Sequence, residues 1–415
     1  MAKRKTSDKD SDSLEDFMDE VGLTPEVLER LGEHHEATKI VAEIVNRLGI
    51  KDSALKRARV ELPSFSKITW GQVASHFGLL RTFGWLSFDS IPGVTLCYLP
   101  PSFHKELLMR SWSAMNVYAE PTQRKLEAPR VRLLDIARLV SSFQYPGLTL
   151  SQYLVPLFAL FAGRIEDFPE HPMPETELSS GGSVEHEYFI VGKILFLVIE
   201  LKANFDDLES NVAQLFSELY AASKLNGDAG FESLTVYGLL TDLGTFHFYS
   251  FNPISKTFYQ DPRMVVHSLL REEFLYGMMA VVDRIFTLVL QGYIDTLKAT
   301  CAKIEEQLSS KQSSSGSPTT KAFLEDWRKA HQHGLAAQNK LKQFSGNETE
   351  LEESAAKGLE SLKNSVACVG RLTYTSSKHD IPSKADLETI AQKAVDKWRV
   401  DLCAEHAVTQ PSSDA

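Results

Sequence analysis

The residues best suited to chemistry are Glu200 and Lys202, which follow an apolar run at positions 194–199. Such a run is typical of a strand covered on both faces, because covered strands lose the alternation of apolar and polar residues. A carboxylate and an ammonium group at the end of a buried strand are costly unless they are paired or reach a cleft. Two residues apart on a strand, they point to the same face. This pattern predicts the geometry of a metal-dependent phosphodiesterase, with the carboxylate on a divalent cation and the lysine near water or phosphate.

The elements around this pair are predicted from local patterns. Residues 184–202 read as a β-hairpin that turns at 191–193, and residues 204–224 as an amphipathic helix that carries Gln214 and Glu218 on one face. A second hairpin is expected at 234–241 and 245–250, over a turn that contains Asp242.

The flanking segments complete the predicted order. A largely buried helix is expected at 151–168, followed by a polar loop with Pro169, Pro172 and Pro174. A long helix is expected at about 264–307. The predicted core order is therefore α-β-β-α-β-β.

The length of 415 residues and the linker-like composition at 308–318 indicate several regions. We predict a tail without stable structure at 1–20 and a mainly helical region at 21–130, with helices near 24–31 and 40–48 and a short strand at 95–99. Residues 70–78 carry a weak helix-turn-helix cue, for which core packing of the aromatic residues is the favoured explanation. The core occupies 131–307, including a helix at 133–143. A Ser-rich linker at 308–318 then leads to a helical extension at 319–415, with helices at about 319–344, 350–366 and 384–405.

Composition narrows the classes of function. The net charge of −11 argues against a protein that coats nucleic acid, but it permits an enzyme with a local basic patch and a bound cation. Four widely spaced cysteines predict reduced thiols, and the polar N-terminus and the lack of a long apolar stretch predict an intracellular protein, nuclear or cytoplasmic, with no membrane partner. Phosphate-cradling glycine loops, nucleophile elbows and cysteine-based metal motifs are absent from the sequence.

Taken together, the motifs resemble the PD-(D/E)XK nuclease superfamily, which has the restriction-endonuclease-like fold, and in particular the nuclease-like domain of Crinkler-type effectors. The resemblance covers about residues 130–295. It is carried by the segments 198–202, 211–215, 237–242 and 246–249.

The resemblance implies roles for individual residues. Glu200 would bind Mg²⁺, which prefers carboxylate oxygens. Lys202 would assist the water or stabilise charge on the phosphate, and Gln214 would support the site from the following helix. The second metal ligand of the family is normally an Asp on the preceding strand. This chain has Glu187 and Glu185 there, and we place Glu187 first because its spacing of thirteen residues to Glu200 fits a hairpin.

Other interpretations remain open on the sequence alone. Glu200 and Lys202 also fit a structural ion pair at a strand end, and residues 185–187 also fit a charged strand edge. The first hypothesis is a Mg²⁺-dependent nuclease. The second is a binding, regulatory or effector protein that keeps the nuclease fold without catalysis. A third assigns the function to the C-terminal helices, which would hold a protein partner.

Overall fold

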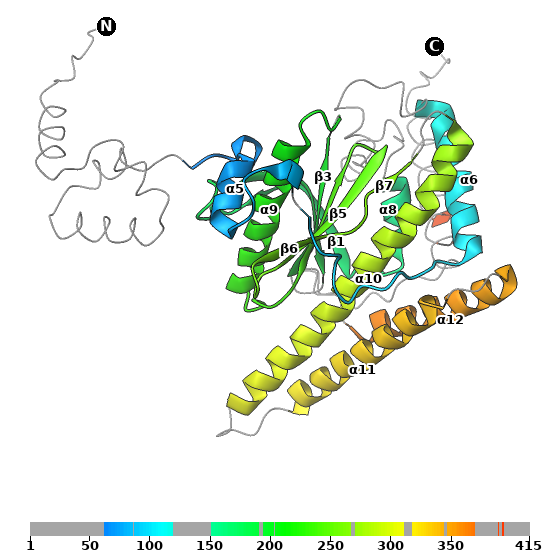
Figure 1. Cartoon of the computed structure of the whole chain (residues 1–415). Coiled ribbons are helices and arrows are strands. Elements are labelled where there is room, and N and C mark those ends of the chain that lie inside the picture. The colour runs from blue at the N-terminus through cyan, green and yellow to red at the C-terminus, as the bar shows by residue number, and fades with distance from the viewer. Residues whose placement is uncertain are drawn as a thin grey trace, which may run out of the picture.

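The computed structural model describes residues 62–85, 87–118, 151–190, 194–202, 204–266, 270–310, 318–343 and 347–369, with 389, 392 and 393. Within these ranges the chain folds as a mixed sheet between two layers of helices (Figure 1), which confirms the α+β class. The segments 1–20, 24–31, 40–48 and 133–143 lie outside the described residues, as do the turn at 191–193 and most of 384–405.

The sheet has seven strands, six of them in the order β1-β2-β3-β4-β5-β6, while β7 pairs with β5. Only β3 and β4 run parallel. A parallel pair needs a crossover connection, and α9 (Leu208–Asp228) provides it. The strands are β1 (Ile165–Met173), β2 (Gly182–Ile190), β3 (Ile194–Leu201), β4 (Val236–Thr241), β5 (Thr245–Asn252), β6 (Thr257–Gln260) and β7 (Met264–Val265).

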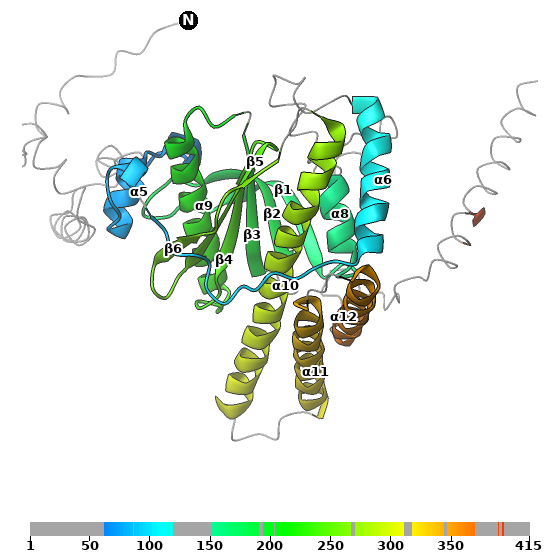
Figure 2. The same cartoon turned by 45° about the vertical axis from the view of Figure 1, so that its right-hand side comes forward.

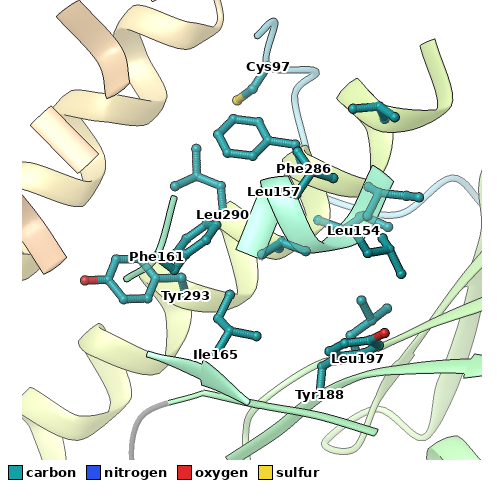
Figure 3. Packing of buried hydrophobic residues seen from close by; sticks show 14 of the residues in the cluster. Cys97, Leu154, Leu157, Phe161, Ile165, Tyr188, Leu197, Phe286, Leu290 and Tyr293 are labelled. Atoms are coloured by element: carbon teal, nitrogen blue, oxygen red, sulfur yellow. The ribbon is translucent and has the colours of Figure 1, made fainter. Parts of the chain in front are cut away.

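Each face of the sheet has its own apolar core. One face packs against α9, which also contacts α5 (Trp70–Phe77). The other face packs against α10 (Arg271–Ser310), together with α8 (Ser151–Ala159) and α6 (Pro101–Tyr118). Figure 3 shows this second core, where Tyr188 and Leu197 of the sheet lie below residues of α8 and α10. Every residue of β3 is buried, as expected for a strand covered on both sides.

A β-bulge in β3 sets the register of its pairing with β2. Tyr188 pairs with Leu197, but Phe189 pairs with Leu195, so Phe196 is the extra residue. Both Phe196 and Leu197 belong to the core on the α10 side. A Cβ atom on Gly292 of α10 would lie only 2.6 Å from the Phe196 ring, so glycine lets the helix approach the bulge.

Both predicted hairpins are confirmed as antiparallel strand pairs, β2 with β3 and β4 with β5. The helix predicted at 204–224 is confirmed as α9. The weak helix-turn-helix cue at 70–78 corresponds to α5, whose Trp70 is buried in the core on the α9 side.

The loop predicted after residue 168 is wrong in its first half. α8 ends at Ala159, a turn with positive φ at Ala162 and Gly163 follows, and the edge strand β1 then runs from Ile165 to Met173. Proline is tolerated in an edge strand because its missing N–H can fall on the unpaired side. The observed order up to β5 is therefore α-β-β-β-α-β-β, with one strand more than predicted.

Two further boundaries differ from the prediction. The long helix begins at Arg271 rather than near 264, because Met264 and Val265 pair with β5. Residues 95–99 are extended but form no strand. Three of their backbone donors bond to helices instead. Cys97 N donates to Thr287 Oγ1 over 2.9 Å and Leu99 N to Asp283 Oδ1 over 3.1 Å, both in α10, and Tyr98 N donates to Leu341 O of α11 over 2.8 Å.

The C-terminal helices extend the core instead of standing apart from it. α11 (Pro318–Leu341) and α12 (Glu348–Cys368) confirm two of the three predicted helices. α11 lies along the second half of α10, and α12 packs against α11 (Figure 2). Trp327, Leu362 and Val366 belong to the same apolar cluster as the α10 side of the sheet. None of the described helices combines the length and apolar character needed to cross a membrane.

The close approach of α10 to the bulge gives a stability prediction. Gly292→Ala should lower the free energy of unfolding by about 1–3 kcal/mol, because the added methyl group overpacks the Phe196 ring. Thermal and urea denaturation measure the change. Gly71→Ala is the matched control, since its Cβ has room in the exposed part of α5 and should stabilise by about 0.5–1 kcal/mol. Equal stability of the two variants would contradict the packing argument.

Candidate functional site

The structure brings Glu200, Lys202 and Gln214 together on the α9 side of the sheet. Glu200 lies in β3 and Lys202 directly follows that strand, where its backbone N–H donates to Thr241 O over 2.9 Å. Gln214 lies in the second turn of α9, which returns along the sheet from the end of β3 (Figure 1). The apolar positions of α9 press this helix onto the sheet, so Gln214 is held over the end of the strand.

These three side chains form a closed hydrogen-bond network. The Lys202 ammonium lies 2.5 Å from Glu200 Oε1 and donates to Gln214 Oε1 over 2.9 Å. Gln214 Nε2 in turn donates to Glu200 Oε1 over 2.6 Å. Glu200 is 2% exposed, and the Lys202 side chain is 17% exposed. The carboxylate is thus neutralised inside the protein, while the ammonium group retains access to solvent.

Glu218 extends the network one turn further along α9. Gln214 Nε2 has two hydrogens and also donates to Glu218 Oε1 over 2.9 Å. Glu218 is fully buried, and its Oε2 has no hydrogen-bond partner among the described residues. Burial, and secondly the charge of Glu200, raise the pKa of Glu218 well above its usual range. This carboxyl group therefore retains a proton at a pH where an exposed glutamate has lost it.

Glu185 of β2 reaches the same place. Its Oε2 accepts the backbone N–H of Leu201 over 2.5 Å. The pairing of His186 with Ile199, continued by one residue, places Glu185 opposite Glu200. Its negative charge contributes to the raised pKa values of Lys202 and Glu218.

We refer to Glu185, Glu200, Lys202, Gln214 and Glu218 as the carboxylate cluster. It holds three carboxyl groups and one ammonium group. Burial by itself lowers the pKa of Lys202, but the charge and hydrogen bond of Glu200 outweigh this effect, so the net shift is upward and the lysine stays charged. The cluster therefore carries an excess of negative charge whenever more than one carboxyl group is ionised.

Glu187, the first-ranked candidate of the preceding strand, has different surroundings. It is fully buried and pairs with Val198 in the sheet. Its Oε2 lies 3.0 Å from His171 Nδ1 in β1. Burial raises the pKa of Glu187 to about 8. The neighbouring His186 is buried as well, so residues 186 and 187 do not form an exposed strand edge.

Glu218 is not among the site residues predicted from the sequence, and Glu185 ranks second to Glu187 in that prediction. The spacing of Gln214 and Glu218 at i, i+4 was the available signal for Glu218. No signal in the sequence locates the bulge at Phe196, which decides the residue that lies opposite Glu200.

The positions of the described side chains limit the kinds of metal ion that they could hold. The described part of the chain contains no group of three or more His, Cys, Asp or Glu side chains placed to hold a metal ion. Mg²⁺ needs fewer protein ligands, because it keeps several waters and binds through one or two carboxylates. Glu185 and Glu200 lie opposite each other on β2 and β3, whereas Glu187 contacts His171.

Comparisons with models of known protein families, with curated proteins and with solved structures find no match for this chain.

The raised pKa of Glu218 predicts how stability depends on pH. In the folded state the group binds its proton more tightly than in the unfolded state, so the free energy of unfolding falls as the pH rises above about 4.5. Glu218→Gln removes this loss. The variant should gain stability over the wild type on going from pH 5 to pH 8, measured by urea denaturation across that range.

The control for this measurement is Glu209→Gln, which removes a carboxylate from an exposed position of the same helix. Its difference from the wild type should change little over the same pH range. A Glu218→Gln difference that is likewise constant with pH would contradict a buried, proton-retaining Glu218.

Proposed function

We propose that this protein is a metal-dependent phosphodiesterase that acts on nucleic acid, with a restriction-endonuclease-like core. The observation that carries the proposal is the contact of Lys202 with both Glu200 and Gln214 at the end of the buried central strand. A carboxylate, a lysine with solvent access and an amide that fixes both are the parts that hydrolysis of a phosphodiester requires.

The order of elements supports the assignment of the core. Glu200 and Lys202 stand at the end of β3, the helix that follows carries Gln214, and that helix leads to the parallel strand β4. The resemblance to the PD-(D/E)XK nucleases implies this sequence of strand, helix and strand around the motif.

Each residue has a role that follows from its contacts. Glu200 and Glu185 would hold the cation, and Mg²⁺ when bound supplies Lewis-acid activation of water and of the phosphate. Lys202 presents a positive charge to a phosphate oxygen or orients a water molecule. Gln214 fixes the relative position of the Lys202 and Glu200 side chains, because its amide contacts both of them. Glu187 is replaced by Glu185 as the second carboxylate in this proposal.

A second candidate is a nucleic-acid-binding or regulatory protein that has this core without catalysis. The observation that favours it is the tight pairing inside the cluster. Glu200 is almost fully buried, and Lys202 already neutralises it. In this case the cluster would be a structural ion-pair network, which also shifts pKa values.

The proposal for the C-terminal helices is separate. α11 and α12 use their apolar faces within the chain, where α11 packs against α10 and α12 packs against α11. Phe323 and Leu335 of α11 remain 45% and 39% exposed. A protein partner of these helices stays a prediction, and deletion of the helices would also disturb the core.

The catalytic proposal predicts a metal-dependent cleavage activity. Purified full-length protein should cleave fluorescent single-stranded DNA, double-stranded DNA or RNA in Mg²⁺ or Mn²⁺, and EDTA should stop the reaction. Lys202→Ala should lower the rate by about 10²-fold or more, because it removes charge stabilisation at the phosphate. Lys224→Ala is the matched control, since Lys224 lies in the same helix as Gln214 but contacts Glu177.

Equal rates for the wild type and Lys202→Ala would rule out this mechanism. If no substrate is cleaved, calorimetric titration with Mn²⁺ separates the two candidates. Binding that Glu200→Gln abolishes would support a cation site, and its absence would favour the non-catalytic protein.

A further inference from the structure

A row of paired residues runs across the strands from the carboxylate cluster toward the far edge of the sheet, on the same face. Glu200 of β3 pairs with Leu240 of β4, and Leu240 pairs with His247 of β5. Directly paired residues point to the same face of a sheet, so Glu200 and His247 both lie on the α9 side. They are two strands apart, which corresponds to about 10 Å.

The row continues to Arg263. Phe246 pairs with Met264 of β7, so the next position of this antiparallel ladder places Arg263 opposite His247. The positive charge of Arg263 contributes to lowering the pKa of His247, after the larger effect of burial, which agrees with their proximity. Arg263 is exposed, and its guanidinium forms no salt bridge within the part of the chain that the structure describes.

The fold does not explain why position 247 is a histidine. The residue is 4% exposed, and its ring packs against Phe205 and Tyr249. Its Nδ1 is buried and has no hydrogen-bond partner among the described residues. A buried polar atom without a partner costs stability, so an apolar residue would serve packing better at this position.

We propose that His247 and Arg263 form a phosphate-binding subsite, which holds a second phosphate of a polynucleotide beside the Glu200–Lys202 pair. Arginine binds phosphate through two parallel hydrogen bonds, and an imidazole N–H adds a third donor. The identity of the ligand rests on the proposed function. Phosphate contacts of this kind position a polynucleotide without reading its sequence.

The charge of the protein makes such a subsite useful. The chain carries a net charge of −11, and the carboxylate cluster is itself rich in acid. A polyanion approaching the cluster meets like charge unless cationic groups lie nearby. Arg263 is such a cation on the same row of the sheet, and it forms no salt bridge with a carboxylate of the described residues.

The test uses the full-length protein and a fluorescein-labelled single strand of twelve nucleotides, as DNA and as RNA. Fluorescence anisotropy in EDTA measures binding at several salt concentrations. Arg263→Ala should weaken binding about tenfold and reduce the slope of log K against log salt by about 0.7–1. Lys105→Ala, an exposed cation of α6 across the sheet, is the control and should leave both values unchanged.

His247→Leu separates a binding role from a packing role. It should weaken oligonucleotide binding several-fold, whereas its thermal midpoint should stay equal to that of the wild type or rise, because the unpartnered nitrogen is removed. Loss of stability without loss of affinity would assign His247 to packing and would overturn its part in the subsite.

The outcomes distinguish this proposal from the proposed function. In a cleaving protein, Arg263→Ala should raise KM with little change in kcat, because uniform binding is lost. Cleavage with unchanged KM and affinity in both variants overturns the subsite and leaves the catalytic proposal intact. Binding that depends on Arg263 without any cleavage supports the subsite and removes the catalytic proposal. No oligonucleotide binding at low salt overturns the subsite.

Discussion

The burial of Glu200 is the constraint on which the site depends. A carboxylate at 2% exposure loses most of its hydration, and this cost is recovered only through short, charge-assisted contacts. Lys202 and Gln214 supply those contacts. α9 must therefore cross the sheet at the position that brings the Gln214 amide within 2.6 Å of the Glu200 carboxylate. The position of Gln214 on α9 is thereby tied to the burial of Glu200.

The α10 side of β3 carries the bulge that determines the residue opposite Glu200. The bulge at Phe196 adds one residue to β3, and Gly292 allows α10 to accommodate it. Without the bulge, the pairing of Ile190 with Ile194 would place residue 184 opposite Glu200. With it, the register moves by one residue, and Glu185 takes that place. Packing on the α10 side thus decides the acid that joins the cluster on the α9 side.

These two features explain which elements and site residues could be predicted from the sequence. The two hairpins, α9, α11 and α12 follow from apolar periodicity and were predicted close to their true bounds. β1 was missed because an edge strand with prolines carries no strand pattern, and residues 95–99 were misassigned because their backbone donors bond to α10 and α11. Glu200, Lys202 and Gln214 could be named from local motifs. The ranking of Glu187 over Glu185 rested on the spacing to Glu200 along the chain, whereas the register across the bulge at Phe196 places Glu185 opposite Glu200.

The negative charge of the carboxylate cluster can be offset in two ways, by a proton on Glu218 or by a bound cation. Three carboxyl groups face one ammonium group. Burial and the charge of Glu200 raise the pKa of Glu218, which favours a proton there that offsets part of the excess. A divalent cation at Glu185 and Glu200 would offset the same excess, so proton and cation would disfavour each other. Gln214 connects the two, because its amide touches both Glu200 and Glu218. In the proposed cation site, the buried Glu218 of α9 would therefore couple the stability of the fold to the affinity for a cation.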